Sequence, residues 1–310
     1  MANVTTEVET NLIGKSQMAK VREVDFIAQF THASLAKLLE VLGTTRKIPM
    51  QEGTTMYTYT TTGTLANGNV PEGEIIPLSR YQRNKTAVGE ITLKKWRKAT
   101  SAEAIMKSGY DEAVRATDAA LLKDVQKTVR TDFFTLLNGF VQEASGTEGQ
   151  AGYQPAVGTS VEGVTLQEVL AKSWAQLQVL FEDDTAAPVH FVNPIDIGDY
   201  LATVNVTTQT AFGMNYIEDF IGLGTVIITN RVTAGTVLST AKENIILYYL
   251  SMNGDIAGKF GLSTDELGYI GINTDIPTTD RAQLETLVMS GIQFFVEYAD
   301  GVVKGTLTEG

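Results

Sequence analysis

The chain contains few side chains that could act as nucleophiles, bases or metal ligands. It has no cysteine and only two histidines, His32 and His190, which excludes disulfides, zinc fingers, iron–sulfur ligation and a thiol nucleophile. His190 lies in an apolar run, where a hydrogen-bonded core histidine is commoner than a base or a ligand. Neither histidine has a partner at the spacing of a catalytic triad or a metal site. We therefore expect no enzyme, no catalytic residues and no metal site.

Two glycine motifs have part of the pattern of a phosphate-binding loop. Gly14-Lys15-Ser16 is similar to the end of such a loop, but Glu9 stands where the motif needs a glycine. Gly222-Leu223-Gly224 lacks the third glycine and the following helix of a dinucleotide site, so we expect a turn before a strand at Thr225. No cofactor is predicted.

Charge is distributed unevenly along the chain. The net charge is −12; residues 1–140 carry +3 and residues 141–310 carry −15. The acidic half disfavours close contact with nucleic-acid phosphate over its surface, and we expect no sequence-specific DNA binding.

A basic cluster stands out against this background, because residues 72–98 contain seven cations and three acids. A solvated face would explain it. A contact with an acidic surface of another copy of the chain explains it better, since the second half of the same sequence supplies that surface. The candidate inter-subunit contact residues are Arg80, Arg83, Lys85, Lys94 and Trp96.

The elements that must position this cluster are predicted from local patterns. Residues 1–20 are polar and indicate a mobile arm, and residues 34–43 predict a short helix. Alternation predicts strands over 54–62 and 86–97. The glycines and prolines of residues 63–85 indicate an irregular loop, so that the whole forms an extended ribbon that needs support from another surface.

A long helix follows the ribbon. Thr100 and Glu103 have the spacing of a capping box, and after a break at Ser108-Gly109 apolar residues recur at helical spacing for about 28 residues, until Asn138-Gly139. Such a helix is about 40 Å long.

The pattern of the sequence after the long helix predicts an α+β arrangement. Residues 143–163 are rich in glycine and polar residues and indicate a boundary. A helix capped by Thr165 and Glu168, and strands over 188–192, 225–229 and 245–250, follow it. Residues 292–304 predict a β-hairpin that turns at Asp300-Gly301.

The order of these parts resembles the major capsid proteins of tailed bacteriophages with the Hong Kong 97-type fold. Phe133-Phe134-Thr135-Leu136-Leu137-Asn138-Gly139 is similar to the usual Phe-Leu-Asn-Gly ending of that family's spine helix. Val192-Asn193-Pro194 and the stretch 224–235 are similar to segments of its axial domain. The resemblance implies an N-terminal arm with a short helix (1–49), an extended β-ribbon loop (50–99), a peripheral domain with the spine helix (100–162), an axial domain (163–275) and closing peripheral strands (276–310).

The resemblance also implies a function and partners. The expected protein is a structural subunit of an icosahedral phage head, assembled in the bacterial host cytoplasm, which forms hexamers and pentamers around double-stranded DNA contacted non-specifically. Scaffolding, portal and decoration proteins are the expected other partners, and no membrane is involved. The scaffolding protein is expected to be separate, because only one short helical pattern precedes the ribbon. The alternatives are an encapsulin-like nanocompartment shell protein, a phage tail protein, which would be dominated by β-structure, and a hydrolase.

Overall fold

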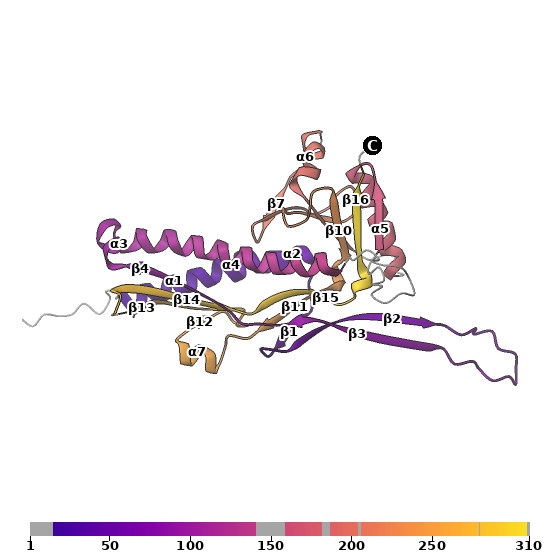
Figure 1. Ribbon diagram of the computed structural model, residues 1–310, viewed down its shortest axis with the longest axis horizontal. Helices are drawn as coiled ribbons and strands as arrows, with labels where there is room; N and C mark the ends of the chain where they lie inside the picture. The colour runs from indigo at the N-terminus through magenta and orange to yellow at the C-terminus, as the bar shows by residue number, and fades with distance from the viewer. Residues whose placement is uncertain (1–14, 141–158, 182–186, 204–205, 279, 309–310) are drawn as a thin grey trace, which may run out of the picture. The chain divides into compact units, whose positions relative to one another are not determined.

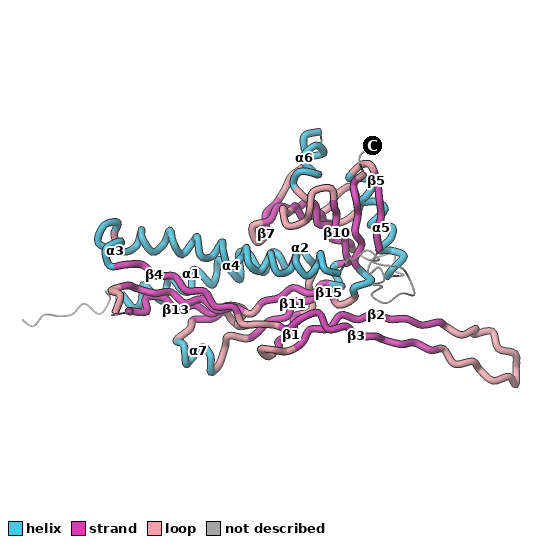
Figure 2. The backbone as a smooth tube through the Cα atoms, in the orientation of Figure 1, coloured by secondary structure: helices cyan, strands magenta, loops and turns pink. Residues whose placement is uncertain are grey.

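The computed structural model describes residues 15–140, 159–181, 187–203, 206–278 and 280–308. These residues form two compact units. Unit 1 contains residues 15–33, 94–122 and 251–290, and unit 2 contains the remaining described residues. Figure 1 shows the elements and Figure 2 their type. No helix among the described residues is both long enough and apolar enough to cross a membrane.

Unit 1 is built on an antiparallel sheet of four strands in the order β12-β13-β14-β4. Its elements are α1 (Lys15–Phe30), β4 (Lys94–Ser101), α3 (Ala102–Ser108), the first part of α4 (Tyr110–Phe140), α7 (Asp255–Phe260), β12 (Ser263–Thr264), β13 (Ile270–Thr278) and β14 (Gln283–Ser290).

A buried carboxylate fixes α1 on this sheet. Glu23 is 1% exposed and accepts hydrogen bonds from the Thr274 backbone N–H at 2.8 Å and from Ser263 Oγ at 2.5 Å. Lys20 Nζ lies 2.8 Å from the same carboxylate. A buried charge is tolerated only when it is paired and hydrogen-bonded, and these partners meet that requirement. The apolar side chains of Phe26 and Ile27 are buried beside it.

Unit 2 contains a sheet of seven strands, a sheet of three and a two-stranded ribbon. The seven strands, in spatial order, are β5 (Thr159–Gly163), β16 (Val302–Leu307), β10 (Thr236–Ala241), β6 (Pro188–Val192), β9 (Thr225–Ile228), β8 (Met214–Ile217) and β7 (Gln209–Ala211). The three-stranded sheet is β1 (Lys47–Met50), β11 (Ile245–Leu250) and β15 (Ile292–Val296), and the ribbon is β2 (Thr55–Thr64) with β3 (Arg80–Glu90). Helices α2 (Ala36–Leu42), α5 (Leu166–Phe181) and α6 (Pro194–Thr203) complete it, together with the second part of α4, a π-helical turn (Thr31–Leu35) that begins in unit 1, and 3-10 turns at Lys242–Asn244 and Ala299–Gly301.

The core of the seven-stranded sheet forms where α5 packs on it. Val169 and Leu170 are fully buried against Val192, Val226 and Val237 of the sheet. The α5 helix begins where predicted, because Thr165 Oγ1 accepts from the Glu168 N–H at 3.2 Å and the Glu168 carboxylate accepts from the Val164 N–H at 3.0 Å. The second part of α4 contributes aromatic side chains: Phe133 and Phe134 contact Phe191 of β6, with ring centroids 5.6 and 5.2 Å apart.

His190 is a buried core residue, as predicted. Its Nδ1 lies 2.7 Å from Ser239 Oγ and its Nε2 lies 3.0 Å from the Leu223 carbonyl. Because a carbonyl only accepts, Nε2 carries the proton and Nδ1 accepts from the serine hydroxyl. The Gly222-Leu223-Gly224 motif is the predicted turn before β9, and both glycines have positive φ angles.

Four predicted elements are wrong in extent. The chain is helical from Lys15, whereas residues 1–14 of the expected mobile arm lie outside the described residues. The cap of α3 is Ser101, whose Oγ accepts from the Ala104 N–H at 3.3 Å, and Thr100 remains in β4. Helix α4 continues to Phe140, where that ring packs on Phe295. Of the predicted boundary 143–163, residues 159–163 form β5, and 143–158 lie outside the described residues.

Three predicted strand arrangements are wrong because alternation does not identify a strand's partner. The expected strand 86–97 is two strands, since β3 pairs with β2 and β4 pairs with β14. The expected irregular loop 63–85 is shorter, because residues 63–64 belong to β2 and residues 80–85 belong to β3. The expected hairpin 292–304 is not a hairpin: β15 pairs with β11, and β16 lies between β10 and β5.

The two units divide the chain differently from the expected domains, whose limits stay a prediction. Residues 251–275, predicted in the axial domain, belong to unit 1. Strand β16, predicted with the closing peripheral strands, lies in the seven-stranded sheet with β6 and β10. The predicted strand over 245–250 is β11, which lies in the three-stranded sheet.

The first testable prediction concerns His190 and acid. Burial lowers the pKa of His190 to about 4, against 6.5 for an exposed histidine, and the hydrogen bond to Leu223 opposes this only in part. The unfolded chain therefore binds a proton between these pH values that the folded chain does not bind. The stabilisation that comes from keeping His190 neutral is complete above pH 6.5 and is lost as the pH falls toward 4. Between pH 7.5 and pH 5 the free energy of unfolding should fall by about 2 kcal/mol from this group.

Urea unfolding followed by fluorescence measures this effect. The chain has two tryptophans, so Trp96→Phe leaves Trp174 of α5 as the reporter of the seven-stranded sheet. In that background, His190→Gln should remove about 2 kcal/mol of the pH dependence. An unchanged pH dependence in the glutamine variant would show that His190 does not titrate in this range.

Candidate interaction surface

Strand β3 of the β2–β3 ribbon is exposed over most of its length. The strands pair from Thr55 opposite Glu90 to Thr64 opposite Arg80, with a bulge beside Met56. Ten residues of strand extend about 33 Å. Residues 65–79 then connect the strands as an irregular tip (Figure 2).

The base of the ribbon is fixed to its own unit by backbone hydrogen bonds. The Glu297 carbonyl accepts from the Tyr59 N–H at 2.9 Å and from Thr58 Oγ1 at 2.8 Å. Asn244 holds the adjoining segment, because its Oδ1 accepts from the Tyr298 N–H at 2.8 Å and its Nδ2 donates to the Tyr298 carbonyl at 3.0 Å. The ribbon base is therefore attached to the segment that follows β15.

Two of the predicted contact cations act within this base. Arg83 Nη2 lies 3.3 Å from Glu297 Oε1, and its guanidinium lies 3.7 Å from the centre of the Tyr59 ring. Arg46 pairs with the other oxygen of the same carboxylate. Lys85 Nζ lies 4.7 Å from the centre of the Tyr57 ring. Both cations thus reach the tyrosine diagonally opposite on β2, a contact worth about 0.5–1 kcal/mol at an exposed site.

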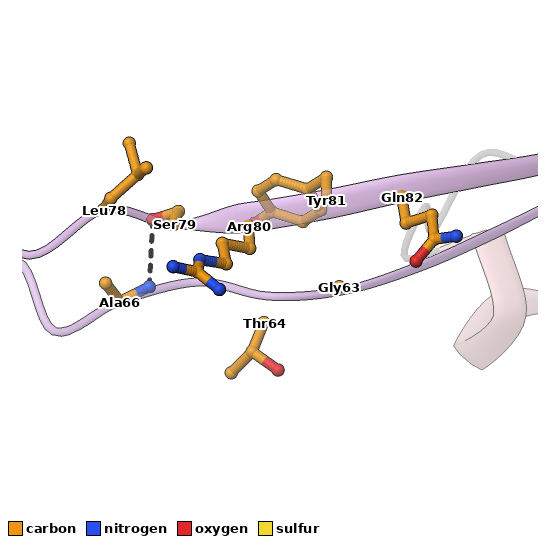
Figure 3. A pocket seen from close by; sticks show the side chains of 8 residues that line it. All are labelled: Gly63, Thr64, Ala66, Leu78, Ser79, Arg80, Tyr81 and Gln82. Atoms are coloured by element: carbon orange, nitrogen blue, oxygen red, sulfur yellow. Dashed lines mark hydrogen bonds between the residues drawn. The ribbon is translucent and has the colours of Figure 1, made fainter.

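Arg80 lies at the other end of β3, where the strands separate. It is exposed and borders an open hollow of about 950 Å³ with Gly63, Thr64, Leu78 and Tyr81 among its lining residues (Figure 3). Ser79 Oγ accepts from the Ala66 N–H at 2.9 Å and joins the two chain segments beyond the strands. Figure 3 shows Leu78 and Thr64 on opposite sides of the ribbon. Arg80 is the predicted contact residue nearest the tip in sequence.

Lys94 and Trp96 belong to a different sheet. Both lie on β4 in unit 1, where Lys94 is opposite Ser290 and Trp96 is opposite Val288. Burial lowers the pKa of the Lys94 ammonium. The five predicted residues therefore occupy two sheets in two units, and the structure groups only Arg80, Arg83 and Lys85 on one strand.

Sequence reasoning missed the partners of the ribbon cations. Glu297, Tyr57, Tyr59 and Tyr298 were not predicted as part of this surface. The two tyrosines of β2 are two residues apart, as are Arg83 and Lys85, so an antiparallel pairing of the strands would have predicted the cation–aromatic contacts. Glu297 had no such signal, because it lies more than 200 residues away along the chain.

The histidines lie outside this surface. His32 is an exposed residue of the π-helical turn, and His190 is in the core. Across the described ranges, no three or more Asp, Glu or His side chains gather so that they could hold a metal ion.

No protein-family model matches the sequence, and no curated protein matches it. Solved structures do match. The capsid of cyanophage A-1(L) superposes with a TM-score of 0.55 at 9% identity, over 88% of this chain and 93% of that chain. The capsid of a native GTA particle gives 0.54 at 10% identity, over 90% and 91%. The capsid of cyanophage P-SCSP1u gives 0.52 at 9% identity, over 88% of each.

These matches cover nearly the whole of each chain, so they compare complete architectures rather than a shared motif. At such low identity they establish the fold alone. The mixture of helices and strands agrees with the predicted α+β class. The chain has the Hong Kong 97-type capsid fold.

Proposed function

We propose that this chain is the major capsid protein of a tailed bacteriophage, a structural subunit that assembles into hexamers and pentamers of an icosahedral head around double-stranded DNA. The observation that carries the proposal is the match of the whole chain to capsid structures, with about nine-tenths of each chain covered. The subunit is not an enzyme, and its activity is assembly.

The exposed ribbon supports this proposal. Its base is attached within unit 2 by Glu297, whereas its tip presents apolar side chains to water. A two-stranded ribbon is marginally stable alone, and subunits that interlock bury such elements in interfaces of thousands of Å². We propose that the ribbon lies on a neighbouring copy, with Arg80 and Lys85 facing its acidic surface. Lys94 and Trp96 on β4 are further candidates for contacts between copies.

The proposed partners follow from the function. Scaffolding, portal and decoration proteins would complete the head, and packaged DNA would be contacted without sequence preference. The virion is the proposed location, after assembly in the cytoplasm of the bacterial host.

The second testable prediction is that the purified chain assembles. Negative-stain electron microscopy should show capsomer rings, irregular shells or sheets. Co-expression with a scaffolding protein from the same source should give uniform closed particles. A chain that stays monomeric at every concentration and salt condition, with and without the scaffold, would contradict the proposal. Uniform closed shells formed by the chain alone would instead favour an encapsulin-like compartment, and cargo analysis would then distinguish protein from DNA.

The third testable prediction separates two arginines of β3. Arg80→Glu should leave the melting temperature of the unassembled chain unchanged and should weaken assembly, most strongly at low salt, where exposed charges are least screened. Arg83→Gln should lower the free energy of unfolding by about 1 kcal/mol, because it removes a half-exposed ion pair and a cation–aromatic contact.

Lys127→Glu is the matched control for Arg80→Glu. Lys127 is exposed on α4, and the substitution changes the net charge by the same amount. Differential scanning fluorimetry and light scattering measure the two effects. If Arg80→Glu and Lys127→Glu impair assembly equally, net charge rather than a ribbon contact is responsible.

A further inference from the structure

Three asparagines of the chain are followed directly by glycine: Asn67, Asn138 and Asn253. Glycine has no side chain that hinders its backbone nitrogen from approaching the preceding asparagine side chain. That nitrogen can attack the side-chain amide carbon and change the residue covalently. The reaction needs both groups to be free in the folded chain, and the structure gives the three pairs different surroundings.

The pairs at Asn138 and Asn253 have groups that are already bonded. Asn138 and Gly139 lie within α4, where backbone N–H groups donate to carbonyls four residues earlier. At Asn253 the side chain is bonded at both ends, because Oδ1 accepts from Thr264 Oγ1 at 2.5 Å and Nδ2 donates to the Glu266 carbonyl at 3.0 Å. In each pair, reaction would first require the loss of these hydrogen bonds.

The pair at Asn67 is different. Asn67 and Gly68 lie in the irregular tip of the ribbon, and both are exposed. Within the described residues, neither Asn67 Nδ2 nor the Gly68 N–H donates a hydrogen bond. Asn67 Oδ1 accepts from the Asn69 N–H at 3.0 Å. This donor stabilises the negative charge that develops on the oxygen when the carbon is attacked, so the local geometry favours the reaction.

We propose that Asn67 is a site of spontaneous deamidation, at which the folded chain forms aspartate and isoaspartate faster than it does at Asn138 or Asn253. The Gly68 nitrogen loses its proton to hydroxide and forms a bond to Asn67 Cγ. The bond from Cγ to Nδ2 breaks, and ammonia leaves with a proton taken from water. Water then opens the resulting succinimide ring at either of its carbonyls, which gives aspartate or isoaspartate.

Either product changes the tip of the ribbon. Both add a negative charge to residues 65–79, whose charged side chains are Glu72 and Glu74. Isoaspartate also routes the main chain through the side-chain methylene, which lengthens the backbone next to Ala66. The Ala66 N–H donates to Ser79 Oγ at 2.9 Å and joins the two sides of the tip, so the longer backbone lies beside this bridge. The proposal does not depend on the proposed capsid function.

The fourth testable prediction follows the reaction by mass spectrometry of the purified, unassembled chain. Trypsin places the three asparagine–glycine pairs on separate peptides, 48–80, 131–172 and 243–259. Deamidation makes a peptide about 1 Da heavier, and fragmentation distinguishes Asn67 from Asn69. Peptide 48–80 should react first. Its rate should rise about tenfold per pH unit, because hydroxide removes the proton from the attacking nitrogen.

Gly68→Ala is the matched control. A Cβ at Gly68 meets no atom within 4 Å, and the φ angle of Gly68 is not in the left-handed region, so alanine fits without strain. Its methyl group hinders the backbone nitrogen, and deamidation at Asn67 should slow about tenfold. An unchanged rate would reject attack by the Gly68 nitrogen and with it the proposal.

Incubation in urea separates the effect of the fold from that of the sequence. In urea the rates at the three pairs should agree within about threefold, because the helix and the side-chain hydrogen bonds are lost. In the folded chain Asn67 should react at least about tenfold faster than Asn138 or Asn253, since these two react only after local opening. Equal rates at the three pairs of the folded chain would overturn the proposal, as would the absence of both products at Asn67.

Discussion

The requirement that a two-stranded ribbon be supported from outside determines much of unit 2. Each strand of the ribbon has only the other as its partner in a sheet, and a single bridge from Tyr59 to Tyr298 joins β2 to the rest of unit 2. A two-stranded ribbon cannot form a core of its own. The structure supports one end by attaching Thr58 and Tyr59 to the Glu297 carbonyl and by placing Arg83 and Arg46 on the Glu297 carboxylate. The other end has no equivalent support in the described residues and presents aliphatic side chains to water. The same ribbon is therefore held in place at its base and exposed at its tip.

The segment that provides this support also links the sheets of unit 2. Residues 292–307 form β15 in the three-stranded sheet, then the anchor at Glu297 and Tyr298, and then β16 in the seven-stranded sheet. Asn244 connects the anchor to the turn between β10 and β11 through hydrogen bonds to both sides of Tyr298. A change at Glu297 would be transmitted to the ribbon and to both sheets, because these contacts share neighbouring backbone atoms.

The proposed function in assembly accounts for the buried polar groups and the exposed surfaces described above. The buried polar groups we describe are paired for structure: Glu23 fixes α1, and Ser239 and Leu223 bond both ring nitrogens of His190, which burial keeps neutral. The exposed features are instead surfaces suited to contacts with other molecules, namely the basic strand β3 and the apolar side chains at the tip of the ribbon. Complementary surfaces at different places on one chain are what a closed, repeating assembly requires.

The sequence alone determined the elements whose signals are local. The period of α4, the break at Gly109, the cap at Thr165, the core position of His190 and the exposed ribbon were predicted, because each depends on residues a few positions apart. Only the tertiary structure decided which strands pair. It divided the predicted strand 86–97 between two sheets, separated β15 from β16 and brought Glu297 to Arg83. Alternation shows that a segment is extended and which of its residues share a face. Hydrogen bonds between backbones are the same for every sequence, so they do not select a strand's partner. The partner is selected by side-chain packing between segments that lie far apart in the sequence.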